Sequence, residues 1–172
     1  VALSATLIAE NAAGTSVGTL TTTDTDAGDT FTYTLSGTDA ASFEILGSTL
    51  KLKDAVSANY ESQASYTVVV TTTDAGGLTT NETFAVSVAN VNETPTALAL
   101  SASSITENAI GATVGILSTT DPDNGDTFTY TLSGTDAASF EISGSTLKLK
   151  ASTTADYETQ SSYAVTVTAT DT

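Results

Sequence analysis

The fold is decided by the stretch Asp29-Thr-Phe-Thr-Tyr-Thr-Leu-Ser-Gly-Thr-Asp-Ala-Ala-Ser-Phe-Glu-Ile45, which recurs unchanged from Asp126 to Ile142. In its first part, Phe31, Tyr33 and Leu35 alternate with threonines. This period of two is typical of a β-strand that packs one face on a core and exposes the other. A Ser-Gly turn and a second short alternation follow. The stretch therefore predicts two strands joined by a turn.

The stretch belongs to a longer repeat. Residues 1–75 align without a gap with residues 98–172, and 52 of the 75 positions are identical. A period of 97 residues makes each repeat a domain of ordinary size rather than one turn of a solenoid. We therefore expect one domain at residues 1–93, a linker at 94–97 and a second domain at 98–172.

Alternation and turn residues place seven strands in the first repeat. They are expected near residues 2–8, 16–22, 30–35, 42–46, 49–53, 65–73 and 79–91. Val17 and Leu20 break the alternation, which indicates a bulge around Gly18. Seven short strands without a helical pattern predict an all-β fold of tandem Ig-like antiparallel β-sandwiches, with about seven strands in each.

The second repeat follows the first until Asp171-Thr172, and no counterpart of the strand at 79–91 comes after it. The second sandwich is therefore expected to lack its last strand and to expose an apolar edge. Three explanations stay open: the chain is cut within a domain, residues beyond 172 supply the strand, or a neighbouring copy donates one. The start at Val1 also indicates a piece of a longer protein.

Composition excludes several classes of partner. The chain has 20 Asp and Glu against four Lys, a net charge of -16, and no Cys, His, Trp or Met. Nucleic acids and anionic membrane surfaces require cations that this chain lacks, so neither is expected as a partner. No apolar run approaches the roughly 18 residues of a membrane-spanning helix, so no membrane insertion is expected.

The acidic residues recur at fixed places, mostly in loops at strand ends. The paired motifs are Glu10-Asn11 with Glu107-Asn108, Asp24-Thr-Asp26 with Asp121-Pro-Asp123, Asn59-Tyr-Glu61 with Asp156-Tyr-Glu158, and Asp74 with Asp171; Asn90-Val-Asn-Glu-Thr-Pro95 lies between the repeats. Two carboxylates about 5 Å apart repel by roughly 1–3 kcal/mol, so recurring clusters indicate a bound cation. Ca²⁺ fits best, because it takes oxygen ligands in loose geometry, whereas Zn²⁺ favours the absent His and Cys. Asp39 and Asp136 are interpreted as turn or surface residues.

In this order the motifs resemble the cadherin repeat, and more closely the bacterial cadherin-like repeats in the extender regions of large RTX or biofilm adhesins. The resemblance covers the whole chain. In that family Ca²⁺ binds between successive domains. It implies a junction site with nine ligands: Glu10, Asn59, Glu61, Asn90, Asn92, Glu93, Asp121, Asp123 and Asp171. It also implies two half-sites, one of Asp24, Asp26 and Asp74, and one of Glu107, Asp156 and Glu158.

The junction departs from the family pattern, because Asn stands at Asn59, Asn90 and Asn92 where Asp is usual. Its six carboxylates suffice for two Ca²⁺ ions, within a range of one to three. We expect weak binding, on the order of 10⁻⁴–10⁻³ M, as in extracellular modules.

The function expected from the resemblance is that of a spacer on a bacterial cell surface, stiffened by Ca²⁺ between successive domains. Its partners would be neighbouring repeats of the same long chain, with contacts to other cells or surfaces made by other domains. A carbohydrate-binding or homophilic module is the alternative. Tyr60 and Tyr157 are the exposed aromatic candidates, although we interpret them as bracing the calcium loops.

An enzyme is not expected, because the chain has no His, Cys or Arg and a repeated small sandwich offers no cleft for paired carboxylates. The four Lys lie in two Lys-x-Lys strand motifs, at 51/53 and 148/150, where they alternate outward. A Lys–Asn isopeptide crosslink, which needs a Lys in the core, is therefore not expected either.

Overall fold

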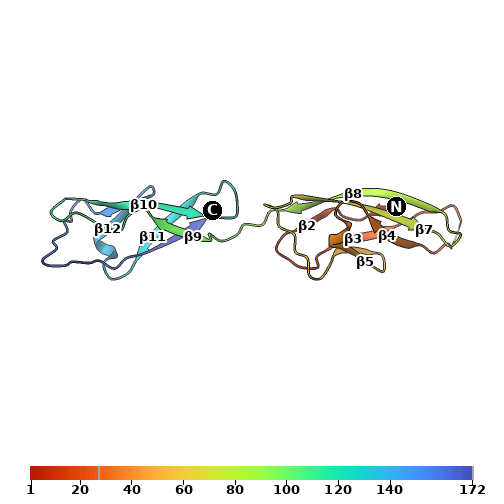
Figure 1. The fold of residues 1–172 in the computed structure, drawn as a ribbon, viewed down its shortest axis with the longest axis horizontal. Helices are drawn as coiled ribbons and strands as arrows, with labels where there is room; N and C mark the ends of the chain where they lie inside the picture. The colour runs from red at the N-terminus through yellow and green to blue at the C-terminus, as the bar shows by residue number, and fades with distance from the viewer. Residues whose placement is uncertain (27, 172) are drawn as a thin grey trace. The chain divides into compact units, whose positions relative to one another are not determined.

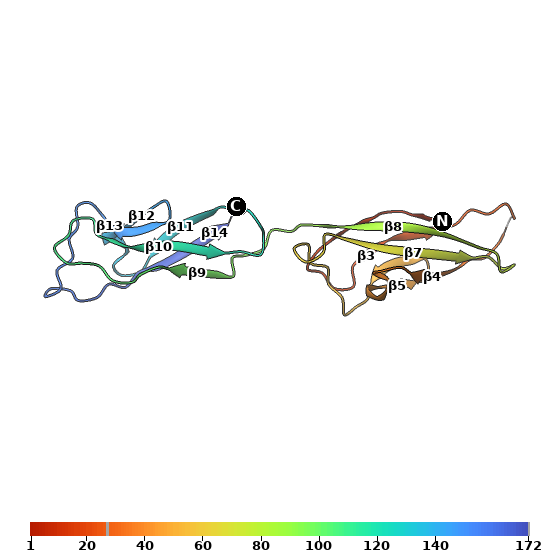
Figure 2. The same ribbon diagram turned by 45° about the horizontal axis from the view of Figure 1, so that its top comes forward.

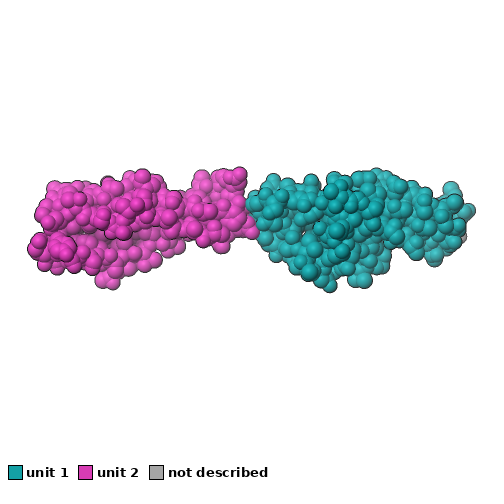
Figure 3. Space-filling model, in the orientation of Figure 1, with its two compact units in different colours: residues 1–91 teal, residues 92–172 magenta. Residues whose placement is uncertain are grey.

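The structure is a computed structural model that describes residues 1–26 and 28–171. Its regular structure is almost entirely β, and the chain divides into two compact units, Val1–Val91 and Asn92–Thr172. Figure 3 colours the two units separately. Each unit is a β-sandwich, which confirms the fold class expected from the alternation of apolar and polar residues.

Unit 1 packs two four-stranded sheets face to face (Figure 1). The first sheet runs in the order β1 (Ala2–Leu3), β3 (Ser16–Thr21), β6 (Thr49–Leu52) and β5 (Phe43–Leu46), and the second in the order β2 (Leu7–Ala9), β8 (Thr79–Ala89), β7 (Ser65–Thr73) and β4 (Thr32–Ser36). Figure 2 shows the long strands β7 and β8 side by side. The pairing of β3 with β6 shifts between Ser16 and Gly18, which confirms the predicted bulge.

The single strand expected at residues 2–8 is wrong. It divides into β1, which pairs antiparallel with β3, and β2, which pairs parallel with β8 in the other sheet. The crossing passes close to Gly18, where a Cβ atom would lie 2.9 Å from the backbone nitrogen of Ala5. Glycine is required there because any side chain would push the crossing segment away.

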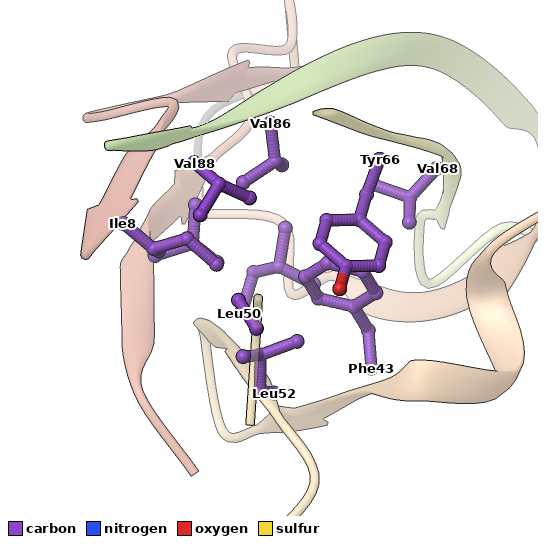
Figure 4. Packing of buried hydrophobic residues seen from close by; sticks show 10 residues of the cluster. Ile8, Phe43, Leu50, Leu52, Tyr66, Val68, Val86 and Val88 are labelled. Carbon is purple, nitrogen blue, oxygen red and sulfur yellow. The ribbon is translucent and has the colours of Figure 1, made fainter. Parts of the chain in front are cut away.

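The core of unit 1 is built from the inward positions of both sheets (Figure 4). Leu50, Leu52, Val68 and Val86 are fully buried. The rings of Phe43 and Tyr66 meet edge to face with centroids 5.5 Å apart. Burying one such aliphatic side chain contributes about 1.5–3 kcal/mol, so β8 supplies a substantial part of this core through Val86 and Val88.

Unit 2 repeats this plan with fewer strands among its described residues. One sheet runs in the order β12 (Phe140–Ser143), β13 (Thr146–Leu149), β10 (Thr113–Thr120) and β9 (Ala97–Leu100), and the other pairs β11 (Phe128–Ser133) with β14 (Thr166–Asp171). The last strand in the described part of unit 2 is β14, the counterpart of β7. Residues 104–106, the counterpart of β2, form no strand.

Asp39 and Asp136 stand directly before the short 3₁₀ turns η1 (Ala40–Ser42) and η2 (Ala137–Ser139), and their carboxylates bond to residues outside these turns. Asp39 accepts hydrogen bonds from the backbone N–H of Thr67 at 2.6 Å and from Gln63 Nε2 at 3.1 Å. Asp136 accepts the equivalent bonds from Ala164 and Gln160, and these bonds lower the pKa of Asp136. Neither Asp39 nor Asp136 is therefore assigned to a ligand site.

Among the described residues, no helix has the length and apolar character needed to cross a lipid bilayer.

Candidate cation-binding carboxylate clusters

The most developed cluster joins three half-buried aspartates of unit 2. Asp121 directly follows β10, Asp126 lies just before β11, and Asp171 ends β14. The antiparallel pairing of β11 with β14 sets Phe128 opposite Asp171, which brings the loop before β11 to the end of β14. One carboxylate oxygen from each aspartate lies within 4.8 Å of the others.

Asp123 adds a fourth carboxylate to this end of unit 2. Its side chain is only 5% exposed. Its Oδ2 atom accepts the backbone N–H of Glu93 at 2.6 Å, and its own N–H donates to Asp121 Oδ1 at 3.0 Å. The segment that enters unit 2 is therefore tied to the Asp121-Pro-Asp123 loop.

The four aspartates leave buried oxygens without hydrogen bonds. These atoms are Asp121 Oδ2, Asp123 Oδ1, Asp126 Oδ2 and Asp171 Oδ2. A buried carboxylate oxygen without a donor or cation is costly, so such atoms are rare in native proteins. The described ion pairs are elsewhere: Lys51 pairs with Glu44 and Asp54, and Lys148 with Glu141.

The pKa of Asp126 reflects the burial and the negative charge of this cluster. Burial raises that pKa above its usual range, and the charges of Asp123, Asp121 and Asp171 raise it further. Each cause disfavours the ionised form, and each would be relieved by a divalent cation. A hollow of about 280 Å³ lies beside Asp121, Asp123 and Asp126. The donor set consists of hard oxygens, which fits Ca²⁺.

Sequence reasoning missed Asp126 as a member of this cluster. It is the first residue of the recurring stretch, and Asp29 holds the same position in unit 1. The available signal was the spacing Asp-x-Asp-x-x-Asp, which places three carboxylates around one turn. Gly125, with a φ of 103°, allows that turn to close.

The corresponding end of unit 1 is more open. Asp24, Asp26 and Asp29 bring one oxygen each within 4.8 Å of the others, but Asp24 and Asp26 are exposed. The structure does not include Asp74 in this three-carboxylate group. Asp74 Oδ1 instead accepts the backbone N–H of Leu78 at 2.8 Å in the turn between β7 and β8.

At the other end of unit 1, Glu10 is a buried clamp, only 3% exposed. Its Oε2 accepts the backbone N–H of Tyr60, and its Oε1 accepts that of Val91, both at 2.7 Å.

Asn59 Oδ1 accepts the N–H of Ser62 at 2.7 Å, which shapes the same loop. Glu61 is exposed beside it. Of the remaining predicted ligands, Asn90 and Asn92 are exposed and Glu93 is half-buried.

The equivalent end of unit 2 carries an exposed cluster of Glu107, Asp156 and Glu158, with one oxygen from each within 4.8 Å of the others. Glu107 accepts the N–H of Tyr157 at 3.1 Å. Hydrogen bonds from the hydroxyl and the N–H of Thr159 hold Asp156 and lower its pKa. The structure thus brings together all three members of this predicted half-site. The rings of Tyr60 and Tyr157 are partly exposed.

The chain is therefore a tandem repeat protein, built of two β-sandwich units that each carry carboxylate clusters at their ends. The chain belongs to the cadherin family: the description "Cadherin domain" matches residues 5–91 and 101–172. Cadherin domains are extracellular adhesion modules that generally bind Ca²⁺ between repeats.

Solved structures of protocadherins share this fold. PcdhgB3 EC1-4 matches with a TM-score of 0.71 and 25% identity over 99% of this chain and 45% of that chain. The extracellular cadherin domains 1-4 of Protocadherin Gamma B7 match at 0.69 and 24%, over 99% and 45%. Human Protocadherin-24 EC1-2 matches at 0.70 and 21%, over 90% and 77%. The chain thus spans less than half the length of the first two proteins.

Proposed function

We propose that this chain is a spacer from a bacterial surface adhesin, and that Ca²⁺ bound at its domain ends stiffens it. Membership of the cadherin family supports the adhesion role. The bacterial surface origin rests on the resemblance of the run from Asp136 to Asp171, with its Asp-Ala-Ala-Ser-Phe and Leu-Lys-Leu-Lys motifs, to bacterial cadherin-like repeats.

One observation supports Ca²⁺ binding most directly. Asp121, Asp123, Asp126 and Asp171 each present a buried oxygen that accepts no hydrogen bond. A cation would neutralise their mutual repulsion and satisfy these oxygens together. In this role Asp121, Asp126 and Asp171 are direct ligands, and Asp123 both binds and holds the incoming segment through Glu93.

The family resemblance extends the ligand set to unit 1. In this proposal Glu61 binds the cation, Asn59 and Asn90 contribute amide oxygens, and Asn92 and Glu93 act from the connecting segment. Glu10 is a ligand whose geometry is already fixed, since both its oxygens accept backbone N–H groups. Ca²⁺ would supply positive charge shared between the two units, and two ions match the number of carboxylates.

The proposal is tested by titrating Ca²⁺ into the chain by calorimetry, with scattering profiles recorded in 10 mM Ca²⁺ and in chelator. We expect saturable binding of about two ions with dissociation constants near 10⁻⁴–10⁻³ M. We also expect narrower interdomain distance distributions in Ca²⁺. Identical scattering profiles in both buffers would refute the stiffening.

A double variant, Asp121→Asn with Asp126→Asn, links any binding to this cluster. Asp54→Asn is its matched control, because Asp54 contacts only Lys51 among the described ion pairs. The double variant is expected to lose the tightest ion and the control to retain it. Unchanged binding by the double variant would place the cation elsewhere.

A further inference from the structure

The acidic loop of unit 2 contains an Asn-Gly pair, Asn124-Gly125, between Asp123 and Asp126. Every other asparagine of the chain precedes Ala, Tyr, Glu or Val, so this pair occurs once in the sequence. At the equivalent place in unit 1 the sequence has Ala27-Gly28. The two otherwise similar loops therefore differ at a position where the residue type decides whether a backbone reaction can take place.

The pair lies in an open turn. Both Asn124 and Gly125 are exposed. Gly125 has a φ of 103°, and a Cβ atom added there would meet no heavy atom within 4 Å. Among the described residues, none accepts the Gly125 N–H in a backbone hydrogen bond. The nitrogen of Gly125 is therefore accessible to the side-chain amide of the residue before it.

This accessibility matters because the backbone nitrogen that follows an asparagine can attack the amide carbon of that asparagine. A side chain on the following residue obstructs the approach, and so does a backbone held in a strand. Glycine removes the first obstacle and an open turn removes the second. Asn81 shows the opposite case, because it lies in β8 opposite Thr71 and is followed by Glu82.

We propose that Asn124 is a site of spontaneous deamidation, which converts it into a mixture of aspartate and isoaspartate. The Gly125 nitrogen loses its proton and bonds to Cγ of Asn124, the Cγ–Nδ2 bond breaks, and the amide nitrogen leaves as ammonia with that proton. Water then opens the resulting succinimide ring. Opening at Cγ gives aspartate, and opening at the backbone carbonyl carbon gives isoaspartate. Solvent water is the only co-reactant, so the reaction requires neither an enzyme nor an oxidant.

The isoaspartate product changes the loop in two ways. Its main chain passes through the former side chain, so the path from Asp123 to Asp126 gains a methylene group. Its free carboxylate adds negative charge beside Asp123, which is already buried. Both changes act on the turn that brings one oxygen each of Asp121, Asp126 and Asp171 within 4.8 Å of the others. The loop of unit 1 contains no asparagine and stays unmodified.

The test is to incubate the 172-residue chain in calcium-free buffers of increasing pH, followed by intact mass and peptide mapping. We expect a mass gain equal to the exchange of an amide for an acid, in the peptide that contains Asn124. Enzymatic methylation of isoaspartate should label the same peptide. The rate should rise about tenfold per pH unit, because the attacking nitrogen must first lose its proton. An Asn124 amide that stays intact, or that reacts no faster than Asn81, would overturn the proposal.

Two matched variants locate the reaction. Asn124→Ala introduces the Ala-Gly pair of unit 1 and should abolish both the mass gain and the isoaspartate label. Asn81→Ala, in β8, should leave both at the wild-type rate. A mass gain in Asn124→Ala equal to that of the wild-type chain would contradict the assignment, and so would its loss in Asn81→Ala.

The effect of this modification on Ca²⁺ binding rests on the proposed function. A chain incubated until isoaspartate predominates should bind Ca²⁺ on the order of tenfold more weakly, because the turn that positions Asp126 is longer. Asn124→Asp adds the charge without lengthening the main chain, and should bind within a few-fold of the unmodified chain. An equal loss in both would contradict the role of the longer turn. Isoaspartate formation with unchanged affinity would refute the cation site at this loop, while the modification itself would stand.

Discussion

The two units carry the same acidic loop in different states. In unit 1, Asp24 and Asp26 are exposed, whereas in unit 2 Asp121 is half-buried and Asp123 is only 5% exposed. In unit 2 the N–H of Glu93 donates to Asp123, so the start of that unit is held against the loop. The comparison teaches that burial of this acidic loop goes together with a backbone N–H donated to its second aspartate.

The clamp glutamates show the same contrast at the other ends of the units. Replacing Glu10 with Ala should lower the stability of unit 1 by about 3 kcal/mol, because the N–H groups of Tyr60 and Val91 lose a charged acceptor in a buried setting. Glu107→Ala should cost far less, since Glu107 is exposed and accepts one bond at 3.1 Å. Urea unfolding of both variants measures the difference, and equal losses would remove the contrast.

Calcium should stabilise the buried cluster more than the open one. At a Ca²⁺ concentration 100-fold above the dissociation constant, binding to the folded state alone adds about 2.7 kcal/mol. We expect this gain in unit 2, with a smaller gain around Asp24, Asp26 and Asp29. Amide hydrogen exchange in 10 mM Ca²⁺ and in chelator resolves the two units. Stronger protection around Asp24 than around Asp121 would reverse the expectation.

Equivalent aspartates should differ in their effect on affinity. Asp126→Asn is expected to weaken the tightest Ca²⁺ site about tenfold or more, equivalent to at least about 1.4 kcal/mol. Asp29→Asn, at the same position of unit 1, should change that site by less than about threefold. Calorimetric titration of the two variants measures both affinities, and an equal loss of affinity in both would contradict the prediction.

The smallest expected effect concerns pH in calcium-free buffer. The pKa of Asp126 is raised, so its contribution to stability is full below the unfolded pKa and is lost as the pH rises through the folded pKa. The pKa of Asp136 is lowered, so its contribution is present above the unfolded pKa and is lost as the pH falls through the folded pKa. Asp126→Asn should therefore change the slope of stability against pH above the usual Asp pKa of about 4, and Asp136→Asn should change it below that pKa, in the opposite direction. Matching slopes in urea titrations would contradict these assignments.

Much of the fold could be predicted because alternation is a local property. The strands β3 to β8 follow the expected ranges closely, since each buries one face and exposes the other. The division of residues 2–8 into β1 and β2 could not be predicted, because the apolar pattern does not say which sheet receives a residue. That choice depends on the crossing beside Gly18, which is a tertiary contact.

The candidate site was predicted in part for a related reason. Asp121, Asp123 and Asp171 were chosen from motif order, and the structure brings them to one end of unit 2. Asp126 was not predicted as a ligand, because the stretch that it begins was interpreted only as two strands joined by a turn. The hydrogen bond from the N–H of Leu78 to Asp74 depends on the hairpin turn between β7 and β8, and the spacing of the motifs does not predict that turn.

The parallel pairing of β2 with β8 has a mechanical consequence. The chain enters unit 1 ahead of β2 and leaves it after β8, so tension along the chain pulls these two strands in opposite directions along their length. All the hydrogen bonds between the two strands then bear the load at the same time, in shear, instead of breaking one after another. The three-residue strand β2 therefore resists extension of unit 1 in shear, in addition to the pairing of β1 with β3 that precedes it in the chain.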